Sequence, residues 1–168
     1  RKVLGAVGVG RDNRPSGDAL RDALCEGLNG AGRDVVDLGV VPTPLVYWSL
    51  HNVDGVSGAI QITGSHNPPE FNGFKLNVGH ASLHGAEIQK LYRLISAAQK
   101  PRRQGAVRFE AIVDRYVEDI ARKIGPLQRR LKIVYDCGNG AGALVAPQLF
   151  KALGVEARGL FAESDGTF

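Results

Sequence analysis

The sequence predicts an α/β protein with a mixed, mainly parallel β-sheet flanked by helices, followed by the beginning of a second, similar α/β unit. Short apolar runs bounded by glycine alternate with segments in which apolar residues recur every three or four positions. The first pattern is typical of buried strands, and the second of amphipathic helices that cover a sheet. Hydrophobic residues form 43% and charged residues 23% of the 168 positions, a composition typical of a globular protein.

In the first unit, strands are expected over residues 3–9, 35–39 and 56–62, and helices over residues 16–31 and 43–53. Ser16 and Thr43 are suitable N-caps, and Pro44 is tolerated at the first helical position. The repeated strand–helix order favours right-handed crossovers and parallel strands, and sites form at the carboxyl ends of such strands.

An antiparallel strand over residues 74–78 and a helix over about residues 86–98 complete the first unit. Apolar and polar side chains alternate along that strand, which places Lys75 on the face opposite the apolar one. The helix carries one apolar stripe, formed by Ile88, Leu91, Tyr92 and Ile95.

The two units are predicted to comprise residues 1–107 and 108–168, because residues 100–106 have the proline, glycine and charges of a linker. In the second unit we expect a helix over 112–124, a buried strand over 131–135, a helix containing Pro147 in its first turn, and a strand over 155–160. The intervening Gly138–Gly142 segment lacks the spacing of a dinucleotide or P-loop motif, and we interpret it as a structural turn.

Charge and composition also limit the classes of partner. The net charge is +4, and the basic clusters at residues 100–103 and 129–132 lack interleaved aromatic residues, so we interpret them as solvated linkers and expect no nucleic-acid partner. No apolar run approaches the roughly 18 residues of a membrane span, and no signal peptide is visible. We therefore expect a cytoplasmic protein with no membrane partner, in which Cys25 and Cys137 are buried thiols.

Residues 63–75, Thr-Gly-Ser-His-Asn-Pro-Pro-Glu-Phe-Asn-Gly-Phe-Lys, are predicted to form a reactive loop just past a strand end. Gly64 is expected to adopt backbone angles closed to other residues, and the two prolines exclude both helix and strand pairing. Ser65 would then lie on a stiff, exposed turn, and Lys75 would return towards it along the antiparallel strand.

The side chains of this loop suit two kinds of chemistry. A serine nucleophile needs a base, whereas a phosphorylated serine needs cations and donors around its oxygens, and His66 and Lys75 suit either role. The alternative is a proline-rich turn whose Ser and Asn side chains cap local backbone groups. Arg11 and Arg14, which follow the first strand, are expected either to bind phosphate or to pin their loop to the Ser65 loop.

The loop closely resembles the phosphoserine loop of the α-D-phosphohexomutase superfamily, in its phosphomannomutase/phosphoglucomutase branch. Phosphoglucosamine mutases resemble it too, but usually carry Ser-Ala-Ser-His-Asn-Pro and an isoleucine at the position of Phe74, which disfavours that branch. The resemblance covers essentially the whole chain, in family order, through Gly10–Gly17, Val41–Pro44 and Asp136–Gly140.

The resemblance implies a mutase that interconverts hexose 1-phosphate and hexose 6-phosphate, of mannose, glucose or both. Ser65 would give its phosphoryl group to the sugar, form a hexose 1,6-bisphosphate, and recover a phosphoryl group from the other end. His66 would transfer the proton and Lys75 would neutralise charge, while Arg11, Arg14 and Asn67 would bind substrate or support the loop. The cofactor would be Mg²⁺, to which this chain contributes only the phosphate on Ser65.

The family's Asp-Gly-Asp-Gly-Asp-Arg metal loop, its Gly-Glu-x-Ser-Gly-His sugar loop and its distal-phosphate domain do not occur in this sequence. We therefore expect a fragment, without the family's first strand, whose partners are hexose phosphate and the remaining domains, and which is inactive alone. Two other classes stay open. One is a serine hydrolase, although an adjacent histidine is not expected to reach the Ser65 hydroxyl easily; the other is a non-catalytic sugar-phosphate-binding homologue.

Overall fold

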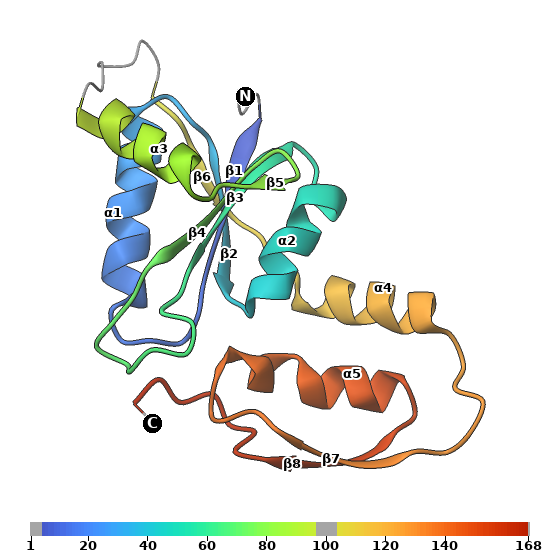
Figure 1. Cartoon of the computed structure of the whole chain (residues 1–168). Coiled ribbons are helices and arrows are strands. Elements are labelled where there is room, and N and C mark those ends of the chain that lie inside the picture. Colours follow the sequence, from blue (N-terminus) through green and yellow to red (C-terminus); the bar gives the residue numbers. More distant parts are fainter. Residues whose placement is uncertain (1–4, 97–103, 168) are drawn as a thin grey trace.

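A computed structural model describes residues 5–96 and 104–167, and shows a six-stranded sheet with a smaller α/β unit beside one end of it (Figure 1). The first unit contains, in chain order, β1 (Ala6–Arg11), α1 (Gly17–Gly30), β2 (Val35–Val40), α2 (Thr43–Asn52), β3 (Val56–Ile62), β4 (Phe74–Val78), β5 (Ala81–Ser82) and α3 (Ala86–Ser96). There follow β6 (Val107–Phe109), α4 (Val113–Ile124), β7 (Lys132–Asp136), the 3₁₀ turn η1 (Ala141–Leu144), α5 (Ala146–Ala152) and β8 (Glu156–Leu160).

The large sheet has the strand order β5-β4-β3-β1-β2-β6. Strands β1, β2, β3 and β6 run parallel, and β4 is antiparallel to β3, with Lys75 opposite Gln61. The predicted fold class and the antiparallel exception are therefore confirmed. Because parallel strands end at the same edge, the loops after β1, β2 and β3 all emerge there.

Alternation along the central strands divides the core into two parts. Ile60 and Ile62 face α1 together with Val9, whereas Ala59 packs in the cluster that includes Leu45 of α2. These side chains have relative exposures of 7% or less, since both faces of a parallel sheet must be covered. The α1 face also contains Cys25, and this burial raises the pKa of its thiol, as expected for a buried cysteine; Cys137 is only half-buried.

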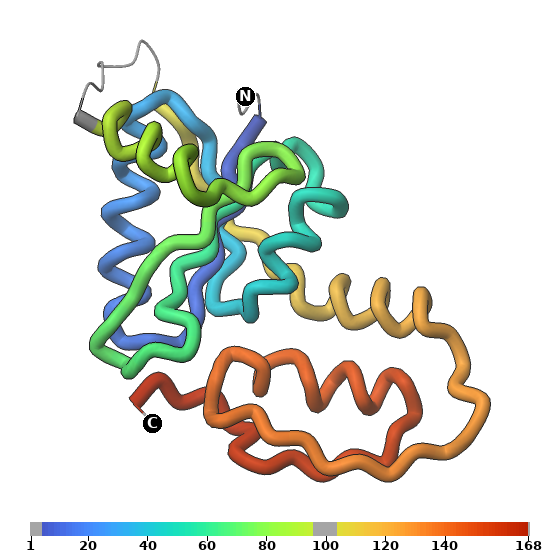
Figure 2. Tube along the Cα trace, in the orientation of Figure 1, coloured from blue at the N-terminus to red at the C-terminus, as the bar shows by residue number. Residues whose placement is uncertain are grey.

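The second unit lies beneath the carboxyl end of the large sheet, as the tube in Figure 2 shows. Its strands β7 and β8 pair in parallel, and α5 packs on one side of the pair, where Tyr135 and Phe150 place their ring centroids 4.9 Å apart. The expectation of a buried strand over 131–135 is wrong, because Val134, on the other side of the pair, is 65% exposed.

The first sheet extends farther along the chain than the predicted boundary after residue 107. Strand β6 pairs with β2, and Ile112 is fully buried in the cluster beneath α2. All three residues of β6 are exposed, and the strand is too short for the alternation of Val107, Arg108 and Phe109 to predict it from the sequence. Parts of three predicted segments lie outside the described residues: residues 100–103 of the linker and basic cluster, residues 97–98 of the helix, and residues 3–4 of the first strand.

Two helix starts and one helix face differ in detail from the expectation. Ser16 occupies the N-cap of α1 without a side-chain capping bond, and its hydroxyl accepts a hydrogen bond from Asn72 instead. Helix α2 begins at Thr43, with Pro42 as its cap. The predicted apolar stripe of α3 is only partly covered by the described residues, since Ile88 and Leu91 are half-buried whereas Tyr92 is 71% and Ile95 66% exposed.

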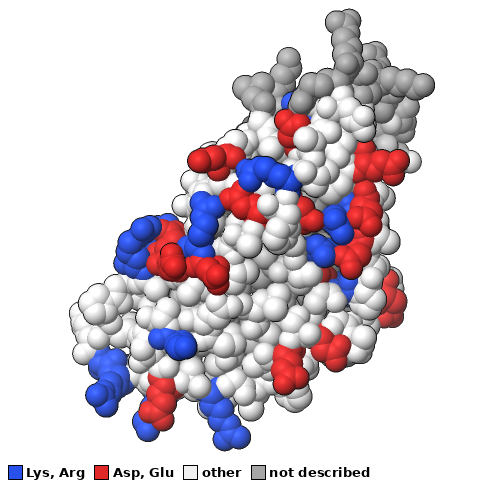
Figure 3. Space-filling model, turned by 180° about the vertical axis from the view of Figure 1, so that it is seen from behind, with Lys and Arg blue, Asp and Glu red and all other residues white. Residues whose placement is uncertain are grey.

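Several charged side chains form ion pairs with neighbours of opposite sign. On the face seen in Figure 3, basic and acidic residues lie intermixed rather than gathered in a single-sign patch. Glu110, for example, forms ion pairs with both Arg108 and Arg115, and Asp37 with Arg21. None of the described helices is both long and apolar enough to cross a membrane.

A buried carboxylate joins α4 to α2. Asp119, which is 6% exposed, accepts hydrogen bonds from Trp48 Nε1 at 2.7 Å and from Lys123 Nζ at 2.6 Å, and it also pairs with Arg122. The bonds from Lys123 and Trp48 lower the pKa of Asp119 to about 2. Tyr116 meets the Trp48 ring edge-on, with ring centroids 5.9 Å apart.

We predict that Asp119→Asn lowers the free energy of unfolding in a pH-dependent way. The lowered pKa of Asp119 in the folded state means that its charge stabilises the fold above its ordinary pKa of 3.8, and that this contribution is lost as pH falls towards 2. Urea unfolding should therefore separate the variant from the wild type at pH 6 and bring them together near pH 2. The neighbouring exposed Glu118→Gln is the control, and an equal effect of both substitutions would contradict the assignment.

Candidate functional site

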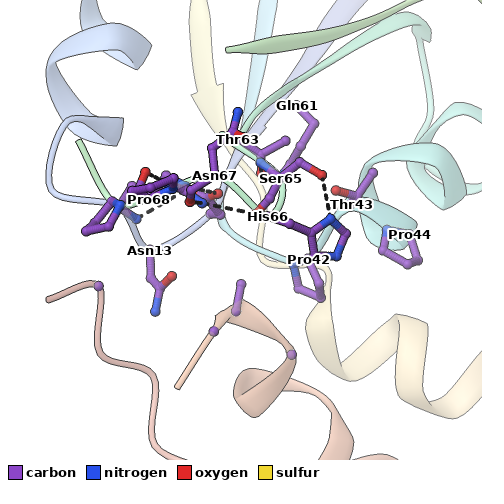
Figure 4. A pocket seen from close by; sticks show the side chains of 17 residues that line it. Asn13, Pro42, Thr43, Pro44, Gln61, Thr63, Ser65, His66, Asn67 and Pro68 are labelled. Carbon is purple, nitrogen blue, oxygen red and sulfur yellow. Dashed lines mark hydrogen bonds and ion pairs between the residues drawn. The ribbon is translucent and has the colours of Figure 1, made fainter. Parts of the chain in front are cut away.

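A cavity of about 630 Å³ lies between the carboxyl edge of the large sheet and the second unit (Figure 4). One wall comes from the loops that follow β1, β2 and β3, and the other from the second unit. The residues of the two walls include Asn13, Arg14, Pro42, Thr43, Gln61, Ser65, His66 and Asn67 on one side and Gly140, Ala141, Gly142 and Gly166 on the other. The structure therefore brings the sequence-predicted loop to the edge where α/β sheets form sites.

Ser65 occupies the most constrained backbone position of the loop. Its φ is +57°, in the left-handed region that a non-glycine residue rarely adopts, and its N–H donates to Thr63 Oγ1 at 3.0 Å. The unusual backbone angles were expected at Gly64 instead. The role of Gly64 is to let Phe71 O and the Arg14 guanidinium approach closely, because a Cβ at position 64 would lie 2.6 Å from Phe71 O and 2.7 Å from Arg14 Cζ. The loop thus holds a strained, exposed serine at the cavity.

Arg14 holds the loop in this conformation. Its Nη1 donates to Pro68 O at 2.6 Å and Phe71 O at 3.0 Å, and its Nη2 donates to Ser65 O at 3.0 Å and Asn67 O at 2.8 Å. Of the two expectations for Arg14, this geometry corresponds to loop support. The Nε, Nη1 and Nη2 groups of the guanidinium all donate to loop carbonyls or to Asp12, so the side chain is not free to bind a phosphate.

Arg11 lies elsewhere. Its guanidinium is 2.7 Å from Asp18 and 3.8 Å from Asp37, and it neither touches the Ser65 loop nor lines the cavity. The reason is the alternation of β1, along which Val7 and Val9 pack on the α1 side and Arg11 continues that face. The expected contact of Arg11 with the loop is therefore not found.

His66 lies beside the serine. Its Nδ1 is 3.1 Å from Ser65 Oγ, so the expectation that an adjacent histidine does not easily reach this hydroxyl is wrong. The left-handed conformation of Ser65 turns the two consecutive side chains towards each other, as the dashed line in Figure 4 shows. Within the described ranges, no carboxylate hydrogen-bonds or ion-pairs with the His66 ring, so these residues do not complete a hydrolase triad.

Lys75 is not in the cavity wall. It is exposed on β4, opposite Gln61, and paired residues of neighbouring strands point to the same face. Gln61 does line the cavity, is 1% exposed, and donates from Nε2 to Val41 O at 3.0 Å. Sequence reasoning missed Gln61, although an amide within an otherwise apolar strand was a visible signal.

The glycine-rich segment of the second unit forms a turn stabilised by backbone contacts. Gly138 and Asn139 have positive φ angles of 51° and 53°, and Asn139 Nδ2 donates to Glu163 O at 3.0 Å. Asn13, from the first unit, donates to Asn139 O at 2.7 Å. The segment thus serves as a structural turn while Gly140 and Gly142 line the cavity.

The described residues do not form a magnesium site. No group of three or more His, Cys, Asp or Glu side chains in residues 5–96 and 104–167 is arranged to hold a metal ion. Asp12, the carboxylate in the cavity wall, accepts hydrogen bonds from the Arg14 backbone and from Arg14 Nε, each at 3.1 Å. Mg²⁺ requires six oxygens in near-octahedral geometry, so these residues alone do not fit it.

Comparison with known proteins is consistent with this geometry. Residues 2–102 match the family model described as phosphoglucomutase/phosphomannomutase, alpha/beta/alpha domain I. The chain is 43% identical over 162 residues to a phosphomannomutase/phosphoglucomutase of Pseudomonas syringae, covering 96% of this chain and 34% of that protein. It is 40% identical over 172 residues to a phosphoglucomutase of Neisseria gonorrhoeae, covering 99% and 36%.

A solved structure supports the same relationship. A phosphoglucomutase/phosphomannomutase family protein from Burkholderia thailandensis superposes with a TM-score of 0.89 at 44% identity, covering 97% of this chain and 37% of that one. The chain belongs to the phosphoglucomutase/phosphomannomutase family. It spans about a third of the length of the relatives that it matches.

We predict that Arg14→Lys loosens the Ser65 loop, because a single ammonium cannot bond four carbonyls arranged around a planar fork. Losing several charge-assisted hydrogen bonds should lower the free energy of unfolding by about 2–4 kcal/mol. Hydrogen exchange of amides 64–71 should be faster in the variant. Arg11→Lys makes the same chemical change three residues away and should leave these amides unaffected; equal exchange in both variants would contradict the role assigned to Arg14.

Proposed function

We propose that this chain provides the phosphoryl-transfer loop of a mutase that interconverts hexose 1-phosphate and hexose 6-phosphate. The observation that carries the proposal is the pairing of a strained, exposed Ser65 with His66 Nδ1 at 3.1 Å inside a cavity at the carboxyl edge of the sheet. Membership of the family agrees with it. The mutases among the relatives are about three times longer than this chain, so the proposal concerns the complete protein.

In the proposed reaction, the bond between phosphorus and Ser65 Oγ breaks as a sugar hydroxyl oxygen bonds to phosphorus, which yields a hexose 1,6-bisphosphate. His66 is assigned to accept the proton of the sugar hydroxyl, and Ser65 Oγ takes up a proton as it leaves phosphorus, with His66 Nδ1 at 3.1 Å as the donor. After the sugar turns round, Ser65 Oγ gives its proton to His66 as it bonds to the other phosphorus, and the sugar oxygen that leaves this phosphorus takes up the proton. Phosphoryl transfer depends mainly on positioning and charge stabilisation, and the constrained loop supplies the positioning.

Charge stabilisation has few sources among the described residues. Arg14 is bonded to loop carbonyls and Arg11 is bonded to carboxylates. We therefore assign this role to Lys75, which lies outside the cavity wall but pairs in register with the cavity-lining Gln61, and to groups of the remaining domains. No step is assigned to Mg²⁺ here, since the described residues provide only the Ser65 phosphate as a ligand.

The central test is phosphorylation of Ser65. Intact-mass analysis of the complete protein should show a phosphate that Ser65→Ala removes. A phosphate retained in that variant would place the phosphorylated residue elsewhere. Because His66 lies close to Ser65, the hydrolase alternative is tested too: covalent labelling of Ser65 by a fluorophosphonate probe would favour it.

In a coupled assay with glucose 1-phosphate, the 168-residue chain alone should show no turnover. An absence of turnover in the complete protein as well would favour a non-catalytic binding homologue.

His66→Ala should lower kcat of the complete enzyme by about 10²–10⁴, the usual loss on removing a general acid or base. His84→Ala is the matched control, because that histidine is exposed and lies outside the cavity wall. The measurement is kcat and KM for glucose 1-phosphate in the same coupled assay. A kcat equal to that of His84→Ala would leave His66 with no part in the chemical step.

A further inference from the structure

Two adjacent residues in the loop after β1 contact different parts of the molecule. Arg14 bonds four carbonyls of the Ser65 loop, among them Ser65 O at 3.0 Å. Asn13 turns the other way, towards the second unit, as Figure 4 shows. Its Nδ2 donates to Asn139 O at 2.7 Å and to Ser164 Oγ at 3.1 Å, across 126 and 151 residues of sequence.

The acceptor for Asn13 is held in place by the second unit itself. Asn139 O also accepts from Asp165 N at 2.8 Å, and Asn139 N donates to Phe161 O at 2.9 Å. The chain approaches Asn13 so closely that a Cβ on Gly166 would lie 1.8 Å from Asn13 O, which only glycine permits. Asn13 thus contacts Asn139, Ser164 and Gly166 of the second unit.

This contact lies between the two walls of the cavity. Ser65 and His66 line it from the first unit, and Gly140 and Gly166 from the second, while Asn13 lies where the walls approach each other. Consecutive Cα atoms are about 3.8 Å apart and their separation does not change, so a displacement of Asn13 by the second unit also displaces Arg14. Arg14 in turn holds the carbonyl of the reactive serine.

We propose that Asn13 is a positioning residue that couples the placement of the second unit to the geometry of the Ser65 loop. When the second unit is seated on Asn13, Arg14 is held where its guanidinium bonds the loop carbonyls. When the contact is broken, the Ser65 backbone loses that support and the serine leaves the geometry needed for transfer. The structural part of this proposal stands on the hydrogen bonds alone, and its effect on turnover rests on the proposed mutase function.

Asn13→Asp separates this role from that of an ordinary turn residue. Asparagine and aspartate are both favoured in turns, so a residue that only shapes the loop would tolerate the change. A carboxylate, however, cannot donate to Asn139 O and would repel it. Gln148→Ala is the matched control, because it removes an amide hydrogen bond to a backbone carbonyl, Leu144 O at 3.0 Å, within the second unit.

The experiment uses the complete protein and two measurements. In Asn13→Asp, hydrogen exchange should become faster in both segments 64–71 and 138–140, and kcat for glucose 1-phosphate should fall about tenfold, as expected for one or two lost neutral hydrogen bonds. Gln148→Ala should change neither quantity. If the aspartate variant does not fold, Asn13→Ala, which deletes the bonds without adding charge, gives the same comparison.

Faster exchange confined to 138–140 would overturn the proposed coupling, because the Ser65 loop would then be independent of the contact. An unchanged kcat in an active enzyme would overturn it as well. If the wild-type complete protein shows no mutase turnover, the proposed function is wrong, and the exchange measurement by itself decides whether Asn13 couples the two segments.

Discussion

The hydrogen bonds of Arg14 are the interaction on which the site depends. The loop residues from Thr63 to Gly73 belong to no helix or strand, so their backbone groups must be held by other contacts. The guanidinium bonds the carbonyls of Ser65, Asn67, Pro68 and Phe71, and Asp12 holds its Nε at 3.1 Å. A serine with φ of +57° persists because these contacts over-determine the turn.

The same loop after β1 also connects the two units. Asn13 makes this connection beside the cavity, and Asp119 makes a second one by joining α4 to Trp48 of α2. Buried apolar contacts accompany the second connection, since Val145 and Ile112 belong to the cluster under α2. The walls of the cavity are thus placed by a polar contact at its edge and by packing farther away.

The residues that line the cavity differed in how visible they were in the sequence. Ser65 and His66 belong to one continuous segment with a distinctive order of residue types, so both could be named and placed at a strand end. Gln61 and Asn13 were not singled out, because their roles arise from partners 20 and 126 residues away in the chain. Whether Arg11 would touch the loop likewise depended on the face of β1 that its side chain leaves.

Local patterns were sufficient to predict the order of the helices and longer strands, the mainly parallel sheet, the antiparallel return of β4 and the position of the Ser65 loop, because periodicity, glycine and proline act within a few residues. Three features were visible only in the folded chain: β6 extends the first sheet, α5 leaves one side of β7 exposed, and the cavity lies between two units. These features depend on which distant surfaces meet. The strand Val107–Phe109 is too short for its alternation to predict it, and its partner β2 lies about 70 residues earlier in the chain.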